Sequence, residues 1–121
     1  MKTCRVVIAD NGRTLVDMAQ IALTSRERLV GLMGRESLAP GEALLILDCW
    51  SVHTFFMRFP IDLAYISPKN AVVKIVPALK PSRISACWRA RSVLEMPSGW
   101  ALKMGLSAGH VLAFQSIDAP T

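Results

Sequence analysis

The chain has 121 residues, of which 52% are hydrophobic and 19% charged, and its formal net charge is +5. This length fits one domain of common size, and the apolar content can build a core without cross-links. The composition excludes a disordered chain, and no apolar stretch reaches the roughly 18 residues that a membrane-spanning helix needs. We therefore expect a single domain over residues 1–121, with its core over residues 15–115 and flexible termini.

The N-terminus and the cysteines favour a cytoplasmic protein. The apolar run from Val6 to Ala9 is too short for the hydrophobic region of a signal peptide, which spans about 7–15 residues. Cys4, Cys49 and Cys87 cannot all pair within the chain, and none lies in a Cys-x-x-Cys spacing. This pattern favours free thiols in a reducing compartment.

A capping box marks the first expected helix. The Thr24 side chain can accept a hydrogen bond from the Glu27 amide while the Glu27 side chain reaches back to Thr24. Leu29, Leu32 and Met33 follow at helical spacing. One side of this short helix is therefore expected to face the core.

Most other segments have the pattern of strands. A turn over Ser67–Asn70 predicts an antiparallel hairpin, Pro97–Gly105 predicts a second short helix, and the tail from Asp118 is expected to fray. Because helices do not alternate with strands, the predicted fold class is mainly β (α+β): a curled or barrel-like, largely antiparallel sheet of about six or seven strands with two short helices. The expected strands are residues 13–23 (as one strand or two), 43–47, 63–66, 72–76, 92–96 and 111–114.

The stretch from Ser51 to Ser67 mixes aromatic and charged side chains. It holds three of the four phenylalanines and the single tyrosine, and places His53, Arg58 and Asp62 among them. A buried polar group without a partner costs about 1–3 kcal/mol. These three side chains are therefore expected either to have specific partners or to face a cleft.

Four segments, taken in order and spacing, resemble the bacterial and archaeal family called domain of unknown function 192. The resemblance covers residues 15–115 and implies a compact, mainly β bacterial domain without an established activity. Many relatives carry an export signal, and most place an acidic residue where this chain has His110, so neither property is transferred. The four segments are residues 28–35, 53–62, 93–99 and 105–109.

The leading hypothesis is a non-catalytic binding or accessory module. A shallow pocket lined by His53, Phe56, Arg58, Asp62 and Glu95 would hold a small ligand or a partner's peptide. Structural roles remain open for the same residues. Asp62 can accept backbone N–H groups or pair with Arg58, His53 can be a core histidine, and alternation along its strand would leave Glu95 solvated or paired with an arginine.

A small metal-assisted hydrolase is the alternative. His53, Asp62 and Glu95 could bind a divalent metal or act as an acid–base pair. No His-x-x-x-His or His-Glu-x-x-His spacing supports a metal, so none is expected. A Cys49–His53 dyad is disfavoured because the charge of Asp48 would raise the pKa of the thiol.

Weak nucleic-acid binding through a basic face, Arg83, Arg89 and Arg91, is a third possibility. The lack of a run of five basic residues disfavours it and favours a solvated face. No phosphate-binding loop or dinucleotide fingerprint occurs, so no cofactor is expected. The expected partner is an unidentified small molecule or protein, and the oligomeric state stays open.

Overall fold

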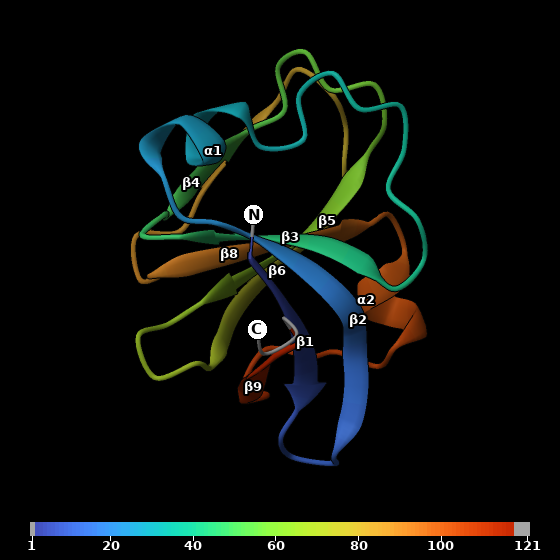
Figure 1. Cartoon of the computed structure of the whole chain (residues 1–121), viewed down its shortest axis with the longest axis vertical. Helices are drawn as coiled ribbons and strands as arrows, with labels where there is room; N and C mark the ends of the chain where they lie inside the picture. The colour runs from blue at the N-terminus through green and yellow to red at the C-terminus, as the bar shows by residue number, and fades with distance from the viewer. Residues whose placement is uncertain (1, 118–121) are drawn as a thin grey trace.

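The computed structural model describes residues 2–117, apart from the side chains of Ser25 and Leu29. The expected frayed tail from Asp118 and the expected core position of Leu29 lie outside the described residues. The mainly β class with two short helices is confirmed (Figure 1). In chain order the elements are β1 (Lys2–Ile8), β2 (Arg13–Ala22), α1 (Ser25–Val30), β3 (Glu42–Leu47), β4 (Ser51–His53), β5 (Ile61–Ile66), β6 (Val72–Leu79), β7 (Ile84–Ala86), β8 (Ser92–Pro97), α2 (Trp100–Lys103) and β9 (Leu112–Ser116).

Seven strands form one mixed sheet in the order β6-β5-β8-β3-β2-β1-β9. Neighbouring strands are antiparallel except for the parallel pair β2–β3. The sheet is not closed into a barrel, and the expected curled or barrel-like form is not confirmed. An isolated bridge between Ala71 and Val111 links the beginnings of β6 and β9.

The described residues contain nine strands, more than the six or seven expected. The sequence analysis assigned no strand to β1. It also missed the short strands β4 and β7, which form a separate two-stranded sheet. Each has three residues, which is too short to display the alternation that identifies a strand.

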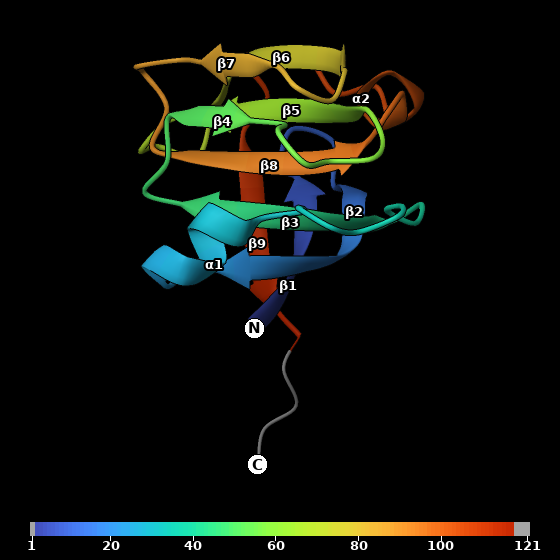
Figure 2. The ribbon, with the colours of Figure 1, turned by 90° about the horizontal axis from the view of Figure 1, so that it is seen from above.

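The central strands β3, β5 and β8 are buried on both faces. Alternate residues belong to two core clusters: Leu45 and Leu94 pack on one face of the sheet, and Leu44, Leu63 and Val93 pack on the other. This division follows from the two-residue period of a strand. Figures 1 and 2 place α1 and β4 over the face that carries the second cluster.

The predicted capping box forms at the start of α1, the helix that covers the second face of the sheet. The Thr24 hydroxyl accepts a hydrogen bond from the Glu27 amide at 3.0 Å, and the Glu27 carboxylate accepts one from the Thr24 amide at 3.0 Å. Gly31, with φ of 51°, ends the helix in a conformation that other residues rarely adopt. The chain then turns so that Leu32 is buried in the second cluster.

Candidate functional site

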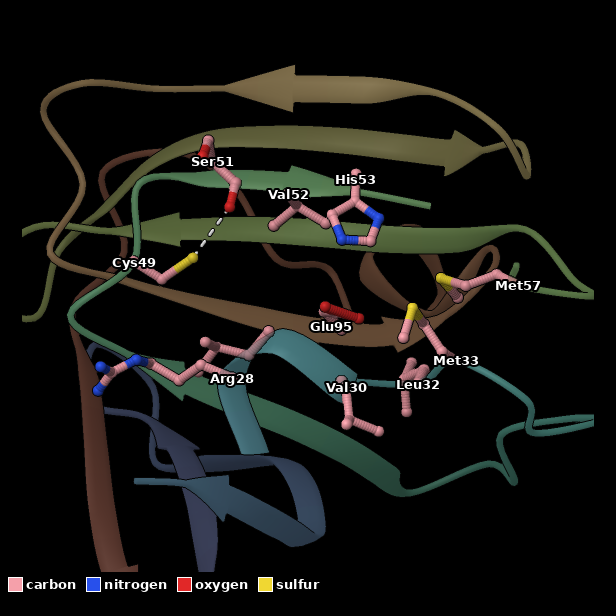
Figure 3. Close-up of a pocket in the computed structure, with 12 residues that line it drawn as sticks. Arg28, Val30, Leu32, Met33, Cys49, Ser51, Val52, His53, Met57 and Glu95 are labelled. Atoms are coloured by element: carbon pink, nitrogen blue, oxygen red, sulfur yellow. Dashed lines mark hydrogen bonds between the residues drawn. The ribbon is translucent and has the colours of Figure 1, made fainter. Parts of the chain in front are cut away.

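A small cavity lies between α1, β4 and the second face of the sheet (Figure 3). Its volume is about 50 Å³, and a water molecule needs about 10–15 Å³ of such space. The cavity can therefore admit an ion or the tip of a ligand, and it is too small to enclose a drug-sized molecule. Its lining consists of Arg28, Val30, Gly31, Leu32, Met33, Ile46, Cys49, Ser51, Val52, His53, Met57 and Glu95.

Glu95 is the acidic group of this cavity. It lies on the central strand β8, directly between Leu44 of β3 and Leu63 of β5, and is 3% exposed. Among the described residues its Oε2 atom has no hydrogen-bond partner. Burial raises the pKa of Glu95 from 4.5 to about 8, and the charge of Arg35 opposes that rise. The Glu95 side chain is therefore predominantly a neutral carboxylic acid at pH 7.

His53 faces the same cavity from β4. Its Nδ1 atom is buried and lacks a hydrogen-bond partner within the described part of the chain. The ring stacks on Phe55, with centroids 5.4 Å apart and an angle of 25° between the planes. In Figure 3 the imidazole and the Glu95 carboxyl group lie on facing sides of the cavity. His53 and Glu95 thus line the same cavity, and each has a buried polar atom without a hydrogen-bond partner in the described part of the chain.

Arg28 and Cys49, two other polar residues of the lining, already have partners. The Arg28 guanidinium donates to the Leu23 carbonyl at 3.1 Å and points away from Glu95 (Figure 3). The Cys49 thiol donates to the Ser51 carbonyl at 2.9 Å, and burial raises the pKa of that thiol. A protonated, hydrogen-bonded thiol is a poor nucleophile, which weighs further against a catalytic Cys49.

Asp62 lies away from this cavity and is sealed from solvent, with 1% of its surface exposed. One carboxylate oxygen accepts from the amides of Ala78 at 2.8 Å and Gly99 at 3.1 Å. The other accepts from the amide of Ala101 at 3.0 Å. The carboxylate thus ties β5 to β6 and to the start of α2, as the structural alternative for this residue foresaw.

Phe56 and Arg58 also lie outside the cavity. Phe56 is 80% exposed with φ of 66°, and Arg58 pairs with Glu36 at 3.6 Å on the surface. Thr54 directly follows β4, and its buried hydroxyl donates to the Lys80 carbonyl at 2.6 Å. The following turn carries these two side chains outward.

The structure therefore corrects the expected set of five pocket residues. His53 and Glu95 line one cavity, whereas Phe56, Arg58 and Asp62 do not. The sequence did not predict that Met33 and Met57 line this cavity together with His53. Met33 had been assigned to the core from its helical spacing, and nothing in the local pattern distinguished Met57.

The predicted basic face is partly engaged in local contacts. Arg91 pairs with Asp48 at 2.8 Å, and Arg89 donates to the Val73 carbonyl at 3.4 Å. Arg83 donates to the Pro81 carbonyl at 3.3 Å. Nucleic-acid binding by these arginines stays a prediction.

Within residues 2–117, no group of three or more His, Cys, Asp or Glu side chains is arranged to hold a metal ion. No helix in the same range is long and apolar enough to cross a membrane.

The fold and the cavity define a class of small, mixed-sheet β domains with a narrow pocket over the central strands. The chain belongs to the family DUF192, described as "Uncharacterized ACR", whose model matches residues 6–114. Three of the four segments that carry the resemblance, residues 28–35, 53–62 and 93–99, supply eight of the twelve residues that line the cavity. The family resemblance and the cavity therefore overlap in these parts of the chain.

Solved structures with the same fold are known. A Sinorhizobium meliloti protein described as a "putative transcription regulator" is 24% identical, with a TM-score of 0.81 over 93% of this chain and 92% of its own. A protein of unknown function from Novosphingobium aromaticivorans is 20% identical, with a TM-score of 0.76 over 92% of this chain and 83% of its own. At these identities the likeness shows the fold. No curated protein matches the chain.

Proposed function

We propose that this protein is a non-catalytic binding module that holds a small ligand, or the tip of a larger one, between His53 and Glu95. One observation carries the proposal: His53 and Glu95 line one cavity of about 50 Å³, and within residues 2–117 neither of the buried atoms His53 Nδ1 and Glu95 Oε2 has a hydrogen-bond partner. Each such atom costs about 1–3 kcal/mol when it stays unpaired. A ligand that bonds to both atoms recovers that free energy.

The composition of the wall supports binding over catalysis. Apart from its few polar groups the cavity is lined by aliphatic and thioether side chains, which orient a ligand and exclude water. Cys49 is a hydrogen-bonded thiol with a raised pKa, which makes it a poor nucleophile. The hydrolase alternative required Asp62 beside His53, but backbone amides already bind both Asp62 oxygens.

Fragment binding tests the proposal. The full chain is titrated with acetamide, ethanol, methylammonium and imidazole, and both the melting temperature and the amide NMR spectrum are followed. We expect at least one fragment to raise the melting temperature and to shift the resonances of the pocket. His53→Ala and Glu95→Leu, which remove the two polar groups, should weaken that response.

Phe56→Ala and Arg58→Ala are the matched controls, because both side chains lie nearby but outside the cavity. These two variants should respond like the wild type. If no fragment shifts the pocket resonances, or if the response survives both pocket substitutions, the binding proposal fails.

A further inference from the structure

Two methionine side chains also line this cavity. Met33 comes from the turn after α1, Met57 comes from the loop after β4, and both line the cavity with His53. Figure 3 shows both thioether groups directed into the cavity on one side of the imidazole ring. Two segments that are distant in sequence thus each contribute a methionine to the lining of the cavity.

We propose that the ligand of this pocket is a soft monovalent metal ion, copper(I), bound by the sulfur atoms of Met33 and Met57 and by the imidazole of His53. This inference rests on the proposed binding function, because it names the occupant of the same pocket. Thioether sulfur is a soft ligand that selects copper(I), and imidazole also binds copper.

The position of His53 suits a metal ligand. Imidazole nitrogen is a common metal ligand, and the Nδ1 atom of His53 is buried without a partner among the described residues. Stacking on Phe55 restrains the plane of the ring. The nitrogen can therefore bind an ion without first breaking a hydrogen bond to the protein.

The other groups of the cavity favour copper(I) over harder cations. The described residues contain no cluster of three His, Cys, Asp or Glu side chains, the ligands that zinc prefers. Val30, Leu32 and Val52 add apolar surface to the same lining, and a volume of about 50 Å³ suits a single ion. A small site with sulfur donors stabilises the reduced ion.

Anaerobic titration of the full chain with copper(I), in competition with a chromophoric chelator, tests this inference. We expect one tightly bound ion per chain. Met33→Leu and Met57→Leu nearly conserve volume, so they should fold normally. Each should weaken copper(I) binding about tenfold or more, because even the supporting partners of metal ligands contribute 10–100-fold.

Met104→Leu is the control, since Met104 packs against the first cluster on the other face of the sheet. Its affinity should equal that of the wild type. A Cys49→Ser variant removes the thiol that shares the cavity and should retain the bound ion. Silver(I), which does not change oxidation state here, should shift the methyl resonances of Met33 and Met57 and leave that of Met104 unchanged.

Two results would overturn the copper(I) assignment: no binding by the wild type, or binding that is lost in Cys49→Ser and kept in Met33→Leu/Met57→Leu. The fragment titration separates this failure from a failure of the binding function. If a fragment binds in a Glu95-dependent way while copper(I) does not, the pocket binds an organic group and only the metal assignment fails. If copper(I) binds and no fragment does, the pocket holds a metal ion and the proposal of an organic ligand held between His53 and Glu95 fails. If neither binds, both proposals fail.

Discussion

Replacing Glu95 with glutamine should change how the stability of the protein depends on pH. In the folded chain burial raises the pKa of Glu95 from 4.5 to about 8. Between these two pH values the unfolded chain has lost the proton and the folded chain keeps it, so wild-type stability falls as the pH rises. Below pH 4.5 both states are protonated, and above about pH 8 both are ionised, so the effect of this group is constant there.

The size of the effect follows from the same two pKa values. Their difference, at about 1.4 kcal/mol per pKa unit, corresponds to a loss of about 5 kcal/mol between pH 4.5 and 8. This is comparable to the whole stability of many small domains, about 5–15 kcal/mol. Glutamine has nearly the shape of the protonated acid and does not titrate. The stability of Glu95→Gln relative to the wild type should therefore rise by about 5 kcal/mol over this range.

Urea unfolding at a series of pH values measures this difference. Tryptophan fluorescence can report it, because the Trp100 indole donates to the Leu15 carbonyl at 2.8 Å and loses that contact on unfolding. Glu42→Gln, an exposed substitution on β3, serves as the control and should follow the wild type at every pH. A constant difference between Glu95→Gln and the wild type would refute the reasoning, since Glu95 would then have the same pKa in both states.

Three further substitutions test the assignment of the other side chains by urea unfolding at neutral pH. Asp62→Ala should lower the free energy of unfolding by about 3 kcal/mol or more, because three backbone amides lose their acceptor; a loss below 1 kcal/mol would contradict this structural role. Arg58→Ala should cost less than about 0.5 kcal/mol, since its ion pair with Glu36 is exposed, and a large loss would place it in the scaffold. Tyr65→Phe should cost about 1 kcal/mol because the Tyr65 hydroxyl bonds to that of Ser85 at 2.9 Å, and unchanged stability would show that this bond contributes nothing.

Local sequence determined much of the secondary structure. The capping box of Thr24 and Glu27 depends on residues three positions apart, and it forms as predicted. The hairpin of β5 and β6 depends on a turn between two apolar runs, and it also forms. These features follow from short-range geometry, which a single sequence displays directly.

The site depended on contacts that the local pattern does not contain. Alternation assigned Glu95 to the face opposite Leu94, which is correct, but that face is covered by α1 and β4 and is not solvated. Asp62 has the residue type of a ligand, yet amides from two other segments enclose it.

The sequence alone thus determined the class of fold, the family segments and the presence of polar residues in apolar surroundings. Only the tertiary structure decided that His53 and Glu95 share a cavity with Met33 and Met57, and that Asp62 does not. The physical reason is that a cavity forms where segments distant in sequence fail to fill the space between them, and that depends on the packing of the whole chain.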